Sequence, residues 1–323
     1  FYRAYQISQN QWLPMAQSTY EVGGELPESF HLLKDQFGWM ITEPSSKVHI
    51  NDLIQLLQTH LEPQNRTFFS FKNTAIYSPI GYLPQALGLW IGRLIHISLL
   101  GLFYLGRIFN LFIWLGLTWA AIRTMPILKW ALLALALMPM TISQAASHSV
   151  DGLLTGLCFL YMARIARAAW DETAHPDWRE IILWGGMLAM ITLCKPAYLF
   201  LGMLVLLVPA RKFGSRWRLI LALLIVGIMA ALAYLGWMQA LAAQGINMAT
   251  AEYYDPLMQI RAIQSAPLAY GILLFETIKR MVLPWVVSAI GYFGWLNQPQ
   301  PPIVYPLYIL FAFILTLFDN HYQ

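Results

Sequence analysis

Long apolar runs, separated by short polar strips, fill the chain from about residue 80 to its end. The runs cover residues 80–96, 101–122, 128–144, 150–169, 181–194, 196–210, 219–238, 266–290 and 303–318. A helix that spans a membrane needs about 20 predominantly apolar residues. The pattern therefore predicts several membrane-spanning helices, together with runs that are too short to cross alone.

The first 78 residues differ from the rest, because they are polar and carry mixed charges without a basic excess. Apolar residues nevertheless recur among them at spacings of three and four, which is typical of one face of a helix. These residues are Ile50, Leu53, Ile54, Leu57 and Leu61. We expect an amphipathic helix here, lying at the membrane interface or packing on a neighbouring segment.

Basic residues gather in three short strips between the apolar runs. The strips contain Arg123 and Lys129, then Arg164, Arg167 and Arg179, then Arg211, Lys212, Arg216 and Arg218. Cytoplasmic loops of membrane proteins carry an excess of Lys and Arg, so we place all three strips in the cytoplasm. An even number of crossings must then separate each strip from the next.

This crossing count predicts two helical hairpins. The runs 128–144 and 150–169 form the first, with residues 144–149 as its outer tip. The stretch 181–210 forms the second, and the Lys195-Pro196 pair supplies its break because a proline disfavours helix in the residue before it. We therefore expect Lys195 at the outer face of the membrane.

The predicted topology divides the chain into four parts. Residues 1–100 form an external loop with amphipathic and interfacial helices, 101–238 the transmembrane helical core, 239–302 a second external region, and 303–323 the start of a C-terminal transmembrane segment. The chain begins at Phe1 without a methionine and stops just after an apolar run, so we expect it to be truncated at both ends.

Two apolar runs in the external regions contain residues that a membrane span disfavours. The run 80–96, with its prolines, glycines and Arg93, fits an interfacial or re-entrant helix. In the run 266–290 we expect an interfacial helix plus a loop, because the run is interrupted by Glu276, Lys279, Arg280 and Pro284.

The composition excludes several classes of protein. Hydrophobic residues make up 58% of the chain and charged residues 11%, whereas soluble domains carry roughly 25% charged residues. A soluble enzyme and a disordered chain are thereby excluded, and an all-α, polytopic transmembrane helical bundle is predicted. The net charge of +4 lies in the basic strips, so we expect membrane lipids and no nucleic acid as partners.

Signatures of soluble cofactor chemistry are missing from the sequence. Cys158 and Cys194 both lie in apolar runs and suggest no disulfide framework. The sequence contains no Walker A motif, no GxGxxG after a strand and no HExxH. A group that this protein transfers would have to come from elsewhere, such as a lipid-linked donor.

Unusual polar residues converge on the predicted outer face. Arg107 lies one turn into the run 101–122, Asp151 lies at the start of the run 150–169, and Lys195 lies at the tip of the second hairpin. Tyr77 and Tyr82 come from the adjoining interfacial segment. Charges at membrane depth are costly and are candidates for function by default. A basic and aromatic cluster with one carboxylate suits an anionic lipid headgroup.

Each of these residues also has a structural interpretation. Arg107 could snorkel or pair with Asp151, and Asp151 could cap a helix after Ser149. Lys195 could anchor the chain at the interface. His148 could be a hydrogen-bonded surface residue instead of a catalytic group.

Several short motifs follow one another in a fixed order. They are Phe1-Tyr2-Arg3-Ala4-Tyr5-Gln6-Ile7-Ser8, Tyr77-Ser78-Pro79 with Tyr82 and Pro84, Gly106-Arg107 with Asn110, Ala146-Ser147-His148-Ser149-Val150-Asp151, Lys195-Pro196 and Gly294-Trp295-Leu296-Asn297. Over nearly the whole chain this order resembles a large family of bacterial predicted membrane proteins of unknown function that is grouped with the GT-C glycosyltransferases.

The resemblance implies a GT-C-like bundle in the bacterial inner (cytoplasmic) membrane. The implied reaction is transfer of a sugar from a polyprenyl-phosphate donor to a cell-envelope glycan or lipid acceptor on the outer face. The family's main catalytic carboxylate would fall immediately before Phe1, with Asp151 as a second carboxylate that orients the acceptor or a divalent cation. Lys195, Arg107 and Arg3 would bind the phosphate.

The substrate site predicted in this way also includes Tyr77, Tyr82 and His148, and it requires no further cofactor. Two other functions stay open, namely a transporter or flippase of lipid-linked or polysaccharide precursors and a non-catalytic envelope assembly subunit. Transporters usually hold their sites near the membrane midplane, between related halves. The charges predicted at the outer face favour an enzyme.

Overall fold

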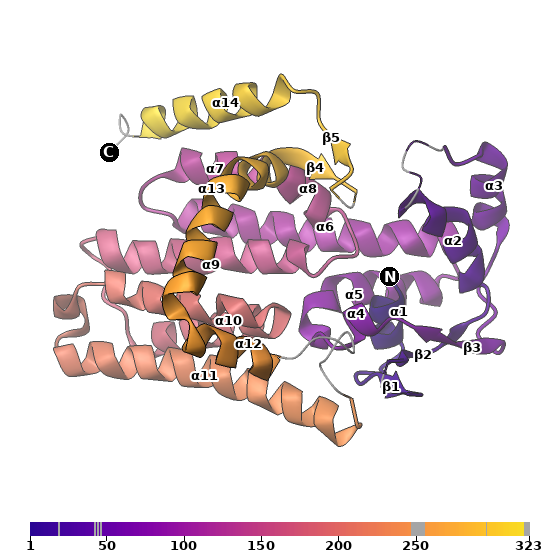
Figure 1. Ribbon diagram of the computed structural model, residues 1–323, viewed down its shortest axis with the longest axis horizontal. Helices are drawn as coiled ribbons and strands as arrows, with labels where there is room; N and C mark the ends of the chain where they lie inside the picture. Colours follow the sequence, from indigo (N-terminus) through magenta and orange to yellow (C-terminus); the bar gives the residue numbers. More distant parts are fainter. Residues whose placement is uncertain are drawn as a thin grey trace.

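The computed structural model describes residues 1–18, 20–41, 43, 45, 47–246, 256–294 and 296–319. These residues are mostly helical (Figure 1). Among them, three helices are long and apolar enough to cross a membrane, namely α6 (Leu99–Thr124), α9 (Asp151–Trp170) and α11 (Arg216–Ala243). The predicted class of a helical membrane protein is confirmed at this level.

The N-terminal region combines short helices with a small sheet. Its elements are α1 (Tyr2–Ser8), β1 (Met15–Ala16), β2 (Val22–Pro27), α2 (Phe30–Phe37), η1 (Gly38–Ile41), α3 (Ile50–Gln58), β3 (Arg66–Ser70), α4 (Lys72–Ala75), η2 (Pro79–Tyr82) and α5 (Leu83–Leu94). The strands pair antiparallel in the order β1-β2-β3, a sheet that the hydrophobic pattern did not predict. In β2, a Cβ on Gly23 would lie 1.8 Å from the carbonyl oxygen of Phe69, so only glycine fits there.

The predicted amphipathic helix is confirmed as α3. Leu56 is fully buried and packs in one hydrophobic cluster with Leu26 and Phe30. Ile50 and Leu57 stay exposed on the same helix. The helix therefore packs on its neighbours through the face that carries Leu56. The apolar face that carries Ile50 and Leu57 is not covered by any of the described residues.

Behind this region, helices lie side by side and form the core of the molecule (Figure 1). Between the long helices come α7 (Lys129–Ala136), α8 (Pro139–Ala145), α10 (Trp178–Cys194), η3 (Pro196–Leu207) and η4 (Ala210–Phe213). Trp184 and Tyr161 are fully buried at the centre of the largest hydrophobic cluster, which draws on α9, α10, η3 and α11. α6 packs along α9 and completes the bundle.

The three basic strips meet at one end of this bundle, as the crossing count predicts. Arg164 Nε donates to Glu180 Oε1 at 2.8 Å, and Lys212 Nζ donates to the carbonyl of Asp171. Thr124, at the end of α6, lines the same cavity as Arg164. Because α6, α9, α10 and α11 each have an end here, this side of the bundle is called the basic end below.

The chain reverses direction where the second hairpin was predicted, although neither α10 nor η3 is among the three candidate spans of the described residues. α10 ends at Cys194, the chain turns at Lys195, and η3 returns along α10, where a Cβ on Gly202 would touch Leu188. The first hairpin differs in one detail, since the run 128–144 is divided into α7 and α8. Pro139 opens α8, and a proline at that position cannot continue the preceding helix.

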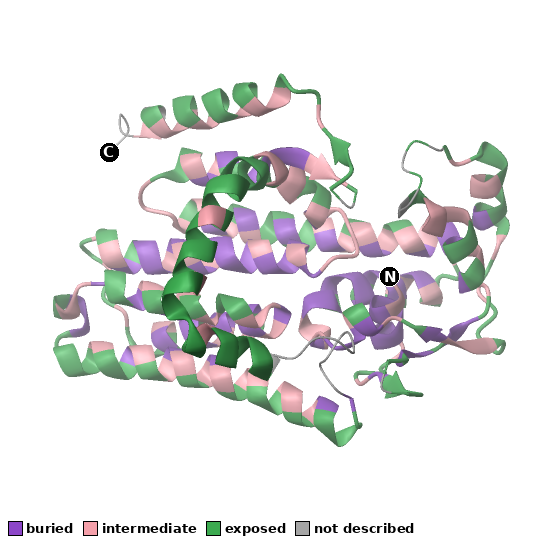
Figure 2. Cartoon of the chain, in the orientation of Figure 1, coloured by how far each residue is buried: buried purple, intermediate pink, exposed green. Residues whose placement is uncertain are grey.

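The C-terminal elements are α12 (Pro256–Ser265), α13 (Pro267–Gly291), β4 (Tyr292–Phe293), β5 (Gln298–Pro299) and α14 (Val304–Phe318). α13 is one continuous helix with Pro284 inside it, so the loop expected in the run 266–290 is wrong. It crosses the bundle in Figure 1, is coloured almost entirely as exposed in Figure 2, and is not among the three candidate spans. α14 is tied to α7 through the Tyr308 hydroxyl, which donates to the carbonyl of Ala134.

The N-terminal region covers the end of the bundle opposite the basic end (Figure 1). Trp237 Nε1, near the end of α11, donates to the carbonyl of Ile76 at 2.9 Å. Leu241 and Ile246 pack with Val22 and Ala75 in a separate hydrophobic cluster. This end is called the capped end below, and it is the side predicted to lie outside.

Cysteine labelling can test this sidedness, because Cys158 and Cys194 are buried and leave a low background. We expect Gln58→Cys at the capped end and Arg216→Cys at the basic end to react with a membrane-impermeant maleimide from opposite sides of sealed vesicles. Both positions are exposed. Reaction of both from the same side would contradict the predicted topology.

Candidate functional site

An ion pair joins two helix ends at the capped end of the bundle. Lys195 Nζ lies 2.6 Å from Asp151 Oδ1, and the side chains are 38% and 25% exposed. Asp151 Oδ2 also accepts a hydrogen bond of 2.7 Å from Ser149 Oγ. Asp151 is the first residue of α9, where the helix dipole favours a negative charge. The pair is thus fixed in place and still open to a ligand.

The local sequence explains why Lys195 meets Asp151. Pro196 follows Lys195 and keeps it out of the helical conformation, so its backbone is extended, with φ −147° and ψ 112°. α10 therefore ends at Cys194, and Lys195 lies at the turn beside the start of α9. Burial alone would lower the pKa of Lys195, but the hydrogen bond and charge of Asp151 outweigh it and raise the pKa above its ordinary value.

Two structural interpretations from the sequence are wrong at this point. Val150 occupies the N-cap position of α9, and Asp151 makes no capping hydrogen bond but turns its carboxylate to Lys195 and Ser149. Arg107 does not pair with Asp151 either. Among the described residues, the ion pair of Asp151 is with Lys195.

Two predicted tyrosines lie around the ion pair. The Tyr77 hydroxyl is close enough to Lys195 to influence its pKa. Tyr82 is 3% exposed, and burial raises its pKa, with a smaller opposing effect from Arg3 and a further rise from Tyr77 and Asp151. Tyr82 therefore keeps its proton at neutral pH and presents a neutral hydroxyl group beside the pair.

Gly81 brings these tyrosines close to the helix ends. A Cβ at this position would lie 2.6 Å from Val150 Cγ1 and 3.3 Å from Cys194 Sγ. The η2 turn therefore sits directly against the start of α9 and the end of α10. This close approach lets the N-terminal region contribute to the same site as the bundle.

Arg107 and His148 form a second group, next to the ion pair along the chain but not bonded to it. Arg107 Nε donates to the carbonyl of Ala146 at 2.6 Å, and its guanidinium lies over the rings of Phe103 and Tyr104. His148 Nε2 lies 2.8 Å from the carbonyl of Phe103, so the proton is on Nε2. Burial lowers the pKa of His148 well below its ordinary value, and the ring is neutral.

Two buried amides, Gln85 and Asn110, hold the loop that leads into Asp151. Asn110 Nδ2 donates to the carbonyl of Ser147 at 3.0 Å, and Gln85 Nε2 donates to the carbonyl of Ser149 at 2.8 Å. Both residues are fully buried. From the sequence, Asn110 was recognised only as part of a motif, and Gln85 was missed. An amide inside an otherwise apolar run is a signal that points to both residues.

Comparison with known families decides the classification. The model of the family described as Predicted membrane protein (DUF2142) matches residues 1–321. The chain belongs to this family. No curated protein and no solved structure matches it. The membrane-protein part of the resemblance is thereby shown, whereas the comparisons show no link to the GT-C glycosyltransferases.

Arg3, the third predicted phosphate ligand, lies in the core of the N-terminal region. It is 1% exposed, and its two terminal nitrogens donate to Gln6 Oε1 at 2.6 Å and to the carbonyl of Trp12 at 2.9 Å. These bonds tie α1 to the segment that follows it. A direct role of Arg3 toward phosphate stays a prediction.

The predicted divalent cation does not fit the residues around Asp151. A hard cation needs several oxygen ligands, whereas Asp151 is already paired with an ammonium group. Among the described residues, no three His, Cys, Asp or Glu side chains come together. We therefore assign no chemical step to a metal ion. The last motif of the resemblance is also incomplete here, because Trp295 lies outside the described residues.

Proposed function

We propose that the protein is an integral-membrane glycosyltransferase, which moves a sugar from a polyprenyl-phosphate donor to a cell-envelope glycan or lipid acceptor. The reaction would take place on the outer face of a bacterial inner membrane. The observation that carries this proposal is the Asp151–Lys195 ion pair, partly open to solvent, at the capped end of the bundle.

Lys195 has the chemistry to receive the donor phosphate. An ammonium group carries three hydrogens, and Asp151 takes one of them. The others remain for the phosphate oxygens of the donor. When the bond between the sugar C1 and the phosphate oxygen breaks, the phosphate leaves with the electron pair, and Lys195 stabilises the charge that develops there.

Asp151 has the chemistry to position the acceptor. Its carboxylate accepts from Lys195 and Ser149 and has lone pairs left for an acceptor hydroxyl. The acceptor oxygen would then attack the sugar C1 while its proton passes to a carboxylate acting as general base. The resemblance places that main base before Phe1, so Asp151 serves to orient the hydroxyl. The hydroxyl groups of Tyr77 and Tyr82 would bind the sugar.

The position of the pair favours a transferase over a transporter. Transporters hold their substrates near the midplane, at broken helices between related halves. Here the pair lies where α9 begins and α10 ends, at the capped end of the bundle. A non-catalytic subunit would have no need for a solvent-accessible ion pair, formed where one helix begins and another ends.

An activity assay tests the proposal. The full-length protein, purified into lipid vesicles, is incubated with radiolabelled polyprenyl-phosphate sugars and an envelope lipid or glycan extract. We expect label to move from the donor lipid to an acceptor, and this transfer to stop when Lys195 is replaced by alanine. Movement of intact labelled donor between the two leaflets without transfer would support a transporter and contradict the proposal.

A further inference from the structure

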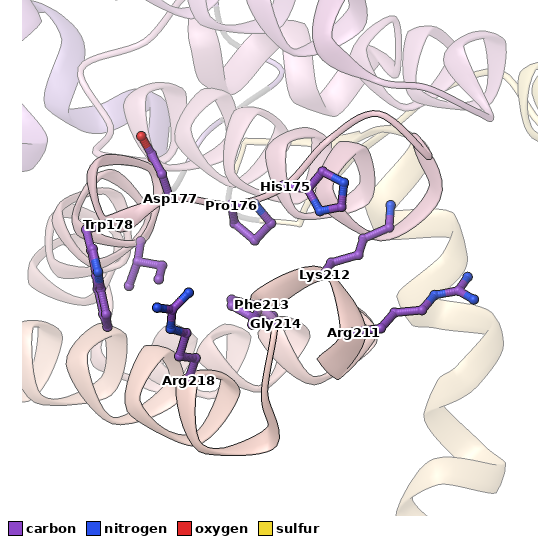
Figure 3. A pocket seen from close by; sticks show the side chains of 10 residues that line it. His175, Pro176, Asp177, Trp178, Arg211, Lys212, Phe213, Gly214 and Arg218 are labelled. Atoms are coloured by element: carbon purple, nitrogen blue, oxygen red, sulfur yellow. The ribbon is translucent and has the colours of Figure 1, made fainter.

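A polar cavity lies at the basic end of the bundle, away from the ion pair. It has a volume of about 380 Å³ and lies between the loop that precedes α10 and the turn that joins η4 to α11. Pro176, Trp178, Ile181 and Phe213 contribute apolar surface to its lining. Figure 3 shows Pro176, Trp178 and Phe213 around the cavity. The rest of its lining holds three cationic side chains, one carboxylate, His175 and Gly214.

The positive charge of this cavity is not compensated. Arg211, Lys212 and Arg218 line it, together with one carboxylate, that of Asp177. Asp177 Oδ1 accepts the backbone N–H of Glu180 at 2.9 Å and so caps α10. None of the ion pairs formed by the described residues includes any of the three cations.

A neighbouring cavity at the same end behaves differently. It has a volume of about 300 Å³ and is lined by Arg164 and Arg167. Arg164 pairs with Glu180, and Arg167 lies 3.5 Å from Asp171. The positive-inside rule demands basic residues on this side but does not explain why one cavity is neutralised and the next is left cationic.

The cations of the first cavity are arranged for a ligand. In Figure 3 the Arg218 side chain points into the space between Trp178 and Phe213, whereas Arg211 points away from it. Lys212 is only 8% exposed, and its bond to the carbonyl of Asp171 fixes its charge at the edge of the cavity. The cavity thus offers one guanidinium directed inward and a second fixed positive charge.

We propose that this cavity binds the phosphate of an anionic lipid headgroup. A guanidinium binds phosphate oxygens through two parallel hydrogen bonds, and basic pockets between transmembrane helices hold such headgroups. Trp178 is 47% exposed, as befits a side chain at the membrane interface.

Native mass spectrometry of the full chain in detergent tests the proposal, with phosphatidylglycerol, phosphatidylcholine and inorganic phosphate as probes. Arg218→Ala is expected to weaken phosphatidylglycerol binding by about tenfold, the size of one lost charge-assisted interaction. Arg216→Ala is the matched control, since Arg216 is exposed in the same helical turn but does not line the cavity. It should change binding by less than about twofold, because a solvent-exposed charge contributes little to a single contact.

Three results would overturn the proposal. Equal losses in the Arg218 and Arg216 variants would mean that only the general charge of the surface attracts the lipid. Equal binding of phosphatidylcholine and phosphatidylglycerol would remove the selectivity for an anion. If inorganic phosphate displaces the lipid at a concentration similar to the lipid's own Kd, the site is one for free phosphate and not for a lipid.

Discussion

Lys195→Ala is expected to lower kcat/KM for sugar transfer by about 100-fold or more, the usual effect of removing one group that stabilises charge in a transition state. The fold should survive. The pair is partly exposed, so its loss costs about 1 kcal/mol of stability. Asp151 keeps its bond to Ser149 and its place at the start of α9.

The matched control for this variant is Lys129→Ala. Lys129 is an exposed lysine at the basic end, so the same charge is removed from the opposite side of the bundle. Transfer measured with radiolabelled donor should stay unchanged in the control and fall in the Lys195 variant at equal protein levels. Equal activity of the two variants would rule out Lys195 as the phosphate ligand.

In Asp151→Asn, we expect donor binding to depend on pH differently from the wild type. Burial lowers the pKa of Lys195, and Asp151 outweighs that effect and raises it. Without the carboxylate, only the smaller effects of Tyr198 and Tyr77 oppose burial, and the pKa of Lys195 falls. A raised lysine pKa keeps the ammonium charged to higher pH, so donor binding in Asp151→Asn should be lost at a lower alkaline pH than in the wild type. KM for the donor, measured across the alkaline range, follows this loss.

The arrangement of the helices could be predicted from the sequence because two strong rules apply to it. Basic strips mark one side of the membrane, and Pro196 breaks the run 181–210 where the crossing count needs a break. The small sheet could not be predicted. β1 is two residues long, and β2 depends on Gly23, whose close approach to Phe69 is visible only once the two strands are paired.

The candidate site was predicted in part. The crossing count brings Asp151 and Lys195 to the same end, but it does not say which cation meets the carboxylate. That choice depends on tertiary packing, which directs Arg107 to the carbonyl of Ala146 and leaves Lys195 for Asp151. The supporting role of Gln85 was missed for the same reason, because its partner at Ser149 is 64 residues away in sequence.

Close packing of the loop before Asp151 leads to the second large effect, a loss of stability in Gly106→Ala. A Cβ on Gly106 would lie 2.6 Å from His148 Cε1. The His148 ring cannot retreat easily, since it is bonded to the carbonyl of Phe103 and packed between Phe1 and Phe103. Overpacking of this kind costs about 1–3 kcal/mol.

Gly116 supplies the control, because it lies in the same helix and a Cβ there would meet nothing within 4 Å. Alanine is a better helix former than glycine by about 1 kcal/mol, so Gly116→Ala should be neutral or slightly stabilising. The helix gain is common to both variants, so they should differ by the overpacking cost alone, about 1–3 kcal/mol in unfolding free energy, measured by denaturation in mixed micelles. A difference near zero would contradict the close packing of α6 against this loop.

A third variant tests the cause of that difference. If the destabilisation arises from the His148 ring, the change from Gly106 to alanine should cost much less in a His148→Ala background, because the added methyl group then enters the space that the ring leaves. A methyl that clashed with the backbone instead would cost the same in both backgrounds. The double-mutant cycle therefore separates a contact with one side chain from a general distortion of α6.

Since the loop from Ala146 to Ser149 leads directly into Asp151, a movement of His148 should also reduce sugar transfer, whereas the Gly116 control should leave it unchanged.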